Sequence, residues 1–65
     1  MGRVPTKATA ENGRIRRGDL LTISSKAGYA MRCDEARKCE GAIIGKALEG
    51  LDKGEGKILV LVMAH

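Results

Sequence analysis

Short apolar segments separated by glycine constrain the fold of this chain more than any other feature. Glycine-containing turn signals stand between the segments at nearly every reversal, and no stretch carries the apolar repeat of a long amphipathic helix. The pattern therefore predicts an all-β fold. We expect a small barrel or β-clip-like module of about five short strands, in one domain over residues 1–65.

The expected strands are residues 3–8, 20–23, 29–33, 42–48 and 57–63, with turns at 11–13 and 16–19 and a loop at 50–56. Pro5 restricts the first strand to an edge or to a position where its nitrogen faces outward. In the third strand, alternation places Tyr29, Met31 and Cys33 on one face. Gly45 marks a bulge or a close backbone approach in the fourth strand. Residues 34–40 are expected to form a helical turn or a loop.

The last expected strand is apolar from residue 58 to 63 without polar alternation. Such a strand is buried on both faces, which for a chain of 65 residues favours a partner subunit over a second layer of its own. The sequence thus predicts a homo-oligomer, with a trimer favoured; a monomeric barrel that covers both faces itself is the alternative. The expected core and interface residues are Leu20, Leu21, Ile23, Met31, Ile43, Leu48, Ile58, Leu59, Val60, Leu61, Val62 and Met63.

Positive charge is concentrated near the N-terminus. Residues 1–17 contain five basic residues and one acidic residue, a net charge of +4 that equals the net charge of the whole chain. Arg14, Arg16 and Arg17 are therefore candidate anion-binding residues. Tyr29 is the only aromatic residue, so the stacking side chains typical of single-stranded nucleic-acid binding are missing, and nucleic acid is not an expected partner.

The two cysteines, Cys33 and Cys39, are six positions apart and allow two interpretations. They can form a disulfide that closes the excursion between them, or they can remain reduced, with Cys33 facing the core. A metal site is less favoured, because His65 is the only histidine available beside the two cysteines and zinc requires four ligands. No cofactor or metal is expected.

Candidate catalytic residues are few. Asp19 could act as a base and Ser24 or Ser25 as a nucleophile, but no Ser-His-Asp or Cys-His arrangement is present. Asp19 after Gly18 is more typical of a carboxylate that accepts a backbone N–H within a turn. We therefore expect a protein that is not an enzyme and has no catalytic residues. No apolar run is long enough for a transmembrane helix, and no membrane partner is expected.

The order of these motifs resembles a short β-rich module found near the C-terminal ends of phage tail-fibre or tail-tip proteins and of fibrous bacterial surface proteins. The resemblance extends over nearly the whole chain and rests on residues 2–5, 11–13, 18–22, 28–31, 44–49, 56–58 and 60–62. A second likeness, to β-clip proteins such as trimeric capsid decoration proteins, rests on residues 15–21. Cys33 and Cys39 are departures from the first pattern.

The resemblance implies a non-catalytic structural or assembly module in a phage particle or extracellular fibre, with a trimer as the favoured oligomer. Its partners would be copies of itself and other virion or fibre proteins, and its location a virion or extracellular surface, with the cytoplasm as the place of assembly. One alternative is a binding module that uses the basic N-terminal region for an anionic glycan, nucleic acid or acidic partner. The other is a subunit of a β-clip-containing enzyme whose active site is completed by another chain.

Overall fold

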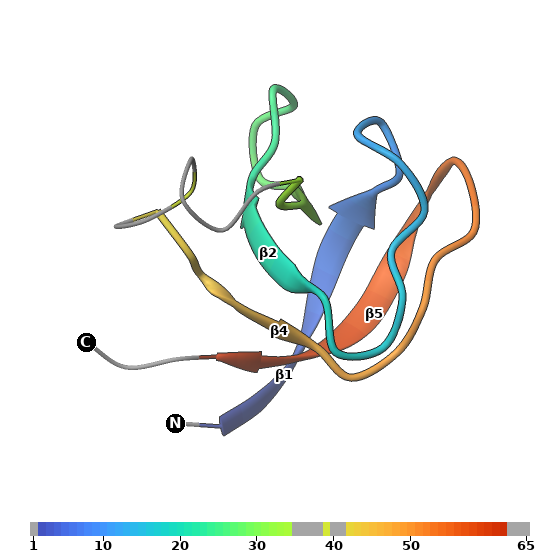
Figure 1. Ribbon diagram of the computed structural model, residues 1–65. Helices are drawn as coiled ribbons and strands as arrows, with labels where there is room; N and C mark the ends of the chain where they lie inside the picture. Colours follow the sequence, from blue (N-terminus) through green and yellow to red (C-terminus); the bar gives the residue numbers. More distant parts are fainter. Residues whose placement is uncertain (1, 35–38, 40–41, 63–65) are drawn as a thin grey trace.

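The computed structural model describes residues 2–34, 39 and 42–62, and these form a small closed β-barrel (Figure 1). The described residues contain no helix, and the predicted all-β fold with five strands is confirmed. In barrel order the neighbours are β1-β3-β2-β4-β5. The strands are β1 (Gly2–Thr9), β2 (Leu20–Ile23), β3 (Ala30–Arg32), β4 (Gly45–Ala47) and β5 (Glu55–Val62).

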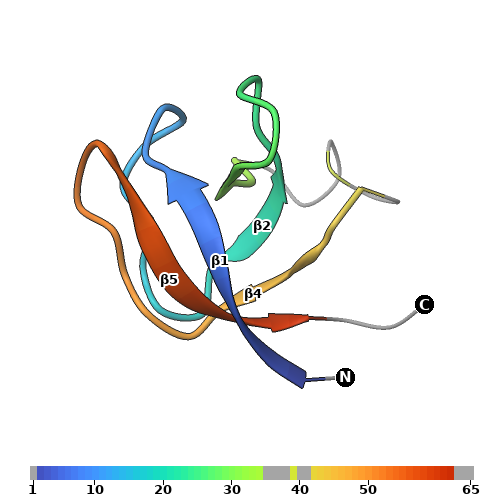
Figure 2. The ribbon, with the colours of Figure 1, turned by 180° about the vertical axis from the view of Figure 1, so that it is seen from behind.

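The first and last strands form the longest pairing in the barrel. β1 and β5 run antiparallel in one continuous register from Gly2↔Val62 to Thr9↔Glu55, so both ends of the described chain lie at the same corner (Figure 2). β5 also pairs with β4 through its last residues, from Ala47↔Val60 to Gly45↔Val62. The C-terminal half of β5 is therefore a central strand, with a neighbour on each side.

The remaining pairings close the barrel with far fewer contacts. β2 pairs antiparallel with β3 and with β4, and β1 meets β3 in parallel at the single pair Ala8↔Ala30. Among the described residues, the part of β1 that precedes Ala8 thus has no strand neighbour on the side away from β5, and this side is an open edge. Pro5 lies on this edge.

The backbone of Pro5 faces outward along that edge. Its partner in β5, Leu59, receives the N–H of Leu48 on its carbonyl oxygen and donates its own N–H to Glu49 Oε1. Because both backbone groups of Leu59 face the 48–49 segment, Pro5↔Leu59 is a pair without hydrogen bonds to each other. Proline has no N–H to donate, and at position 5 no hydrogen bond to β5 is lost, because the backbone of Pro5 does not face that strand.

The observed strands differ from the expected ones mainly at their ends. Residues 20–23 match, and β1 extends the expected 3–8 by one residue at each end. β3 and β4 are shorter than the expected 29–33 and 42–48, while β5 begins two residues before the expected 57. The expected loop at 50–56 is correspondingly too long, because Glu55 and Gly56 pair with β1. The expected helical turn at 34–40 falls mostly outside the described residues.

The predicted turns at 11–13 and 16–19 both form, with Gly13 and Gly18 at positive φ. The first turn does not produce a hairpin. β1 is followed by a long connection in which Ile15 forms an isolated β-bridge, through reciprocal backbone hydrogen bonds of 2.9 Å with Leu51. This bridge buries Ile15 and ties the connection to the loop before β5.

The core is built from small side chains. Its buried residues are Ala8, Ile15, Leu21, Ala30, Ala47, Ile58 and Val60, with Ile44 and Leu51 packed against them. Three of the seven are alanines, so little apolar area is available to stabilise the fold. Backbone pairing and cross-links must supply a large part of its stability.

Only Leu21, Ile58 and Val60 of the expected core and interface residues belong to this core. Ile23 is 65% exposed and Val62 38% exposed, so neither contributes to it. Leu20, Met31, Ile43, Leu48, Leu59 and Leu61 are partly buried, and Met63 lies outside the described residues. In β3 the core position is Ala30 rather than Met31, because the face carrying Ala30 is the one that turns inward.

Position 45 requires a glycine because the backbone of a neighbouring strand approaches it closely, as the sequence indicated. A Cβ atom at this position would lie 2.5 Å from the carbonyl oxygen of Leu61 and 2.7 Å from Cγ1 of Val60. Neither atom can withdraw easily, because both belong to the central strand β5. Gly45 therefore allows β4 to approach β5 closely enough to close the barrel.

We expect Gly45→Ala to destabilise the protein by about 2–3 kcal/mol, as overpacking against a rigid neighbour does. Chemical denaturation of the two proteins would measure the difference in free energy of unfolding. Gly2→Ala is the matched control, because a Cβ at Gly2 meets nothing within 4 Å. Equal stability of the Gly45→Ala and Gly2→Ala variants would contradict the close-approach explanation.

Candidate functional site: an apolar sheet face and an arginine-lined cavity

The outer face of the β1–β5–β4 sheet carries apolar side chains between basic ones. Residues directly opposite each other in antiparallel strands share a face, so the register places Leu61 between Arg3 of β1 and Lys46 of β4. Leu59 lies opposite Pro5 on the same face. The inward-facing Ile58 and Val60 are buried, whereas Leu59 and Leu61 are only partly buried. Lys7 and Lys57 belong to the same face as Leu59 and Leu61. We give the name outer β5 face to the set Arg3, Pro5, Lys7, Lys46, Lys57, Leu59 and Leu61.

The opposite face of the same strands is also apolar beyond the end of the barrel. Val4 pairs with Val60, and Val62 pairs with Gly2 and Gly45, all on the inward-facing side. Val4 is nevertheless 45% exposed and Val62 38% exposed, because this corner extends past the closed part of the barrel (Figure 1). The corner of the β1–β5 pair therefore presents apolar side chains on both faces.

The basic side chains of the outer β5 face have no acidic partners among the described residues. Arg3, Lys7, Lys46 and Lys57 form no ion pair there. Lys7 lies directly opposite Lys57, a like-charge pair that disfavours folding. Lys7 also lies 5.9 Å from the centroid of the Tyr29 ring. The face thus has an apolar centre and a positively charged rim.

A cavity of about 310 Å³ lies elsewhere on the molecule and is lined by Arg14, Arg16, Asp19 and Arg32. Arg14 and Arg16 flank Ile15, whose side chain is buried in the core. In an extended segment, successive side chains point to opposite sides of the backbone. Because Ile15 points inward, Arg14 and Arg16 on either side of it point outward. Arg32 comes from the end of β3, so the cavity joins two distant parts of the chain.

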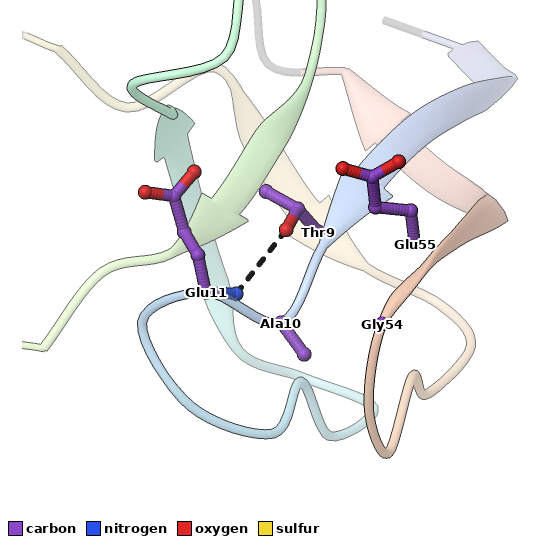
Figure 3. A pocket seen from close by; sticks show the side chains of 5 residues that line it. All are labelled: Thr9, Ala10, Glu11, Gly54 and Glu55. Carbon is purple, nitrogen blue, oxygen red and sulfur yellow. Dashed lines mark hydrogen bonds between the residues drawn. The ribbon is translucent and has the colours of Figure 1, made fainter.

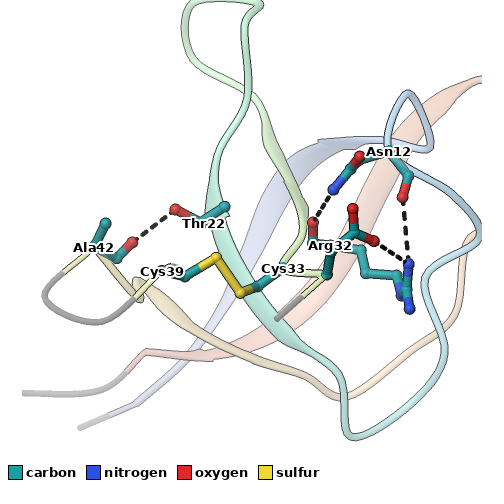
Figure 4. The surroundings of a disulfide bond; sticks show 7 residues. Asn12, Thr22, Arg32, Cys33, Cys39 and Ala42 are labelled. Atoms are coloured by element: carbon teal, nitrogen blue, oxygen red, sulfur yellow. Dashed lines mark hydrogen bonds and ion pairs between the residues drawn. A yellow bond between two sulfur atoms is a disulfide. The ribbon is translucent and has the colours of Figure 1, made fainter. Parts of the chain in front are cut away.

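Hydrogen bonds and ion pairs hold Arg32 in place (Figure 4). Its Nη1 lies 2.7 Å from Asp34 Oδ1 and donates to the carbonyl oxygen of Asn12 at 3.4 Å. In return, the Asn12 side chain donates to the carbonyl oxygen of Arg32 at 3.0 Å. Arg32 Nε is 3.9 Å from Asp19 Oδ2. These contacts fix one wall of the cavity.

Asp19 performs the turn role that the sequence indicated. Its Oδ2 accepts the backbone N–H of Arg16 at 2.8 Å, and the N–H of Asp19 donates to the carbonyl oxygen of Arg16 at 3.0 Å. Ser25 Oγ donates to Glu11 Oε2, and Ser24 Oγ bonds within its own loop. Asp19 and these serines are thus held in separate contacts.

The structure brings together two of the three expected anion-binding residues. Arg14 and Arg16 line the cavity, but Arg17 does not. Arg32 does line it and was not predicted, because nothing in the sequence links the third strand to the segment around residue 15. The turn containing Asn12 and Gly13 makes that link, and its contact with Arg32 depends on the folded structure.

Cys33 and Cys39 form a disulfide beside this region (Figure 4). Nearby, Thr22 Oγ1 donates to the carbonyl oxygen of Ala42 at 2.9 Å, which ties the far side of the same excursion to β2. Of the two interpretations that the sequence left open, the structure has the bridged one. The disulfide and this hydrogen bond therefore both constrain the described part of the connection between β3 and β4.

A second, more open depression is lined by Thr9, Ala10, Glu11, Gly54 and Glu55 (Figure 3). Its two carboxylates already have partners. Glu11 accepts the Ser25 hydroxyl at 2.6 Å, and Glu55 accepts Lys26 Nζ at 2.7 and 2.6 Å. The hydrogen bond to Glu55 raises the pKa of Lys26 above its ordinary value of 10.5. These contacts link the β2–β3 loop to the turn after β1 and to the start of β5.

Comparison with known proteins gives no relative for this chain. No family model, no curated protein and no solved structure matches it. The described residues contain no cluster of three or more histidine, cysteine or acidic residues that could hold a metal ion. They also contain no helix long and apolar enough to cross a membrane.

Removing the disulfide should lower the free energy of unfolding by about 2 kcal/mol, the chain-entropy value for so short a loop. The Cys33→Ser/Cys39→Ser double variant, compared with the oxidised protein by chemical denaturation, measures this loss. Wild-type protein treated with a reductant is the matched control and should agree with the double variant. Rapid alkylation of both cysteines in the untreated native protein would contradict the bridge.

Proposed function

We propose that the protein is a non-catalytic assembly module that forms a homo-oligomer, most simply a trimer. The observation that carries the proposal is the corner of the β1–β5 pair, which has apolar side chains on both faces. Val4 and Val62 are exposed on one face, and Leu61 is only partly buried on the other. A second copy would remove these side chains from water.

The small core supports the same proposal. Seven buried apolar residues, three of them alanines, stabilise a lone domain weakly. Oligomerisation is one of the few ways in which a chain of 65 residues gains further apolar burial. The apolar run that predicted an interface therefore remains the best candidate for one.

Charge favours a ring over a two-fold dimer. In a two-fold dimer the outer β5 face would meet itself, and its rim of Arg3, Lys7, Lys46 and Lys57 would face the same four charges. A head-to-tail contact, in which this face meets a different surface of the next copy, avoids the repulsion. Three is the smallest number of copies that closes such a ring.

The end of β2, across the barrel from β1 and β5, offers an apolar surface of the required kind. β2 is not a neighbour of either strand and lies on the other side of the barrel (Figures 1 and 2). Ile23, at the end of β2, is 65% exposed, the largest exposure among the large apolar side chains described. We propose that the end of β2 around Ile23 in one copy packs on the corner of the β1–β5 pair of the next, covering Val4, Val62 and the adjoining Leu61 of the outer β5 face.

We place this module in a phage particle or an extracellular fibre, the settings that its sequence resemblance implies. A Cys33–Cys39 disulfide is compatible with such oxidising surroundings. Other virion or fibre proteins would then be its further partners.

Light scattering behind size exclusion should give a mass of about three chains for the wild-type protein. The mass should persist at high salt, because salt does not screen apolar contacts, whereas it does screen repulsion between basic side chains.

Leu61→Glu should give a monomer. Its carboxylate would stand between Arg3 and Lys46, so the fold should tolerate the change while the apolar contact is lost.

Ala27→Glu adds the same charge on an exposed loop between β2 and β3 and serves as the control. It should keep the wild-type mass, and circular dichroism should show that both variants are folded. Ile23→Glu should dissociate the assembly as Leu61→Glu does. A wild-type protein that is monomeric at all concentrations tested would overturn the proposal.

A further inference from the structure

We propose that the cavity between Arg14, Arg16 and Arg32 is a binding site for a tetrahedral oxyanion, a phosphate or sulfate group carried by a small polar molecule. The site is independent of the assembly surfaces, because its arginines come from the β1–β2 connection and the end of β3.

The fold directs the arginines to one place by two constraints. Burial of Ile15, fixed by its backbone bridge to Leu51, turns Arg14 and Arg16 outward. The contacts of Arg32 with Asn12, Asp34 and Asp19 hold the third guanidinium against the same space. Arg32 is thus fixed before a ligand binds, which lowers the entropy lost at that one donor group, whereas the backbone sets only the direction of Arg14 and Arg16.

Two of the three guanidiniums retain capacity for a ligand. Arg16 forms no ion pair with a described acidic residue, and Arg14 has only a 3.9 Å contact with Asp52, whose side chain is 85% exposed. Asp19 adds negative charge to the cavity, but its carboxylate is engaged by the Arg16 N–H and lies beside Arg32. The unmatched charge in the cavity is therefore positive.

The number of donors favours a tetrahedral anion over a carboxylate. Guanidinium groups bind oxyanions through pairs of parallel N–H groups, and three of them offer more donors than two carboxylate oxygens can accept. A phosphate or sulfate ester presents three terminal oxygens. The chemistry of the lining therefore matches such a group best.

The size of the cavity indicates more than a bare anion. Its volume of about 310 Å³ is at the lower end of the range for small-molecule pockets, which leaves room for a body attached to the anionic group. All four lining side chains are charged, so that body must be polar. A sugar phosphate and a sugar sulfate share this chemistry.

Glucose 6-phosphate and glucose 6-sulfate are suitable probes, with unmodified glucose as the uncharged comparison. Amide chemical shifts of isotopically labelled protein should change around Arg14, Arg16, Asp19 and Arg32 on addition of either ester and not on addition of glucose. A larger response to one ester would identify the phosphate or the sulfate as the preferred source of the group.

The Arg14→Gln/Arg16→Gln variant should weaken binding of the preferred ester by about tenfold or more, because it removes two charge-assisted contacts. Arg17→Gln is the control: it removes one positive charge, against the two removed by the double variant, from the neighbouring position that does not line the cavity, and its affinity should stay within about twofold of the wild type. Both variants leave Arg32 and its structural contacts in place.

Two results would overturn the site. One is the absence of any shift change with either ester at millimolar concentration. The other is an equal loss of affinity in Arg17→Gln and in the double variant, which would show that general surface charge attracts the anion. Solution mass, measured separately, tests the assembly proposal, so either proposal can fail alone.

Discussion

The antiparallel pairing of β1 with β5 is the constraint on which the rest of this structure depends. It joins the two ends of the described chain over eight residues of each strand, whereas the parallel contact of β1 with β3 consists of one residue pair. Without it, the barrel would open into a sheet with two free edges. The close contact of Gly45 with β5 then brings β4 onto the other side of the same strand.

Cross-links compensate for a core that contains few large side chains. The Ile15–Leu51 bridge, the Cys33–Cys39 disulfide and the Lys26–Glu55 ion pair each join segments that the strands alone would leave loosely attached. The ion pair is exposed and contributes little by itself. The disulfide acts on the unfolded chain and does not require apolar area, which suits a domain of this size.

Local pattern predicted the strands well, and it predicted the core poorly. Glycine and alternation mark roughly where strands lie, so the five strands and the special role of Gly45 could be read from the sequence, while the ends of β3, β4 and β5 could not. The narrow interior of the barrel has room only for small side chains at Ala8, Ala30 and Ala47. These residues were missed because alanine gives no strong apolar signal in the sequence. Ile15 was missed because it is a single apolar residue between arginines, buried by a long-range bridge.

The cavity shows the same limit for function. Arg14 and Arg16 are visible in the sequence as a basic cluster, and the alternation around Ile15 explains why they point the same way while Arg17 does not line the cavity. Arg32 enters through a contact between residues 20 positions apart, with Asn12. The positions of Asn12 and Arg32 in the sequence do not predict such a contact.

Pro5 has a consequence for how copies of this protein can come together. The open edge of β1 would otherwise be a template on which further strands could add without limit, the route by which β-rich proteins form insoluble fibrils. A strand approaching this edge meets a position that has no N–H to offer, beside the charged side chains of Arg3 and Lys7. Growth by strand addition is therefore blocked, and ordered association is left to side-chain faces, which can close on themselves and stop.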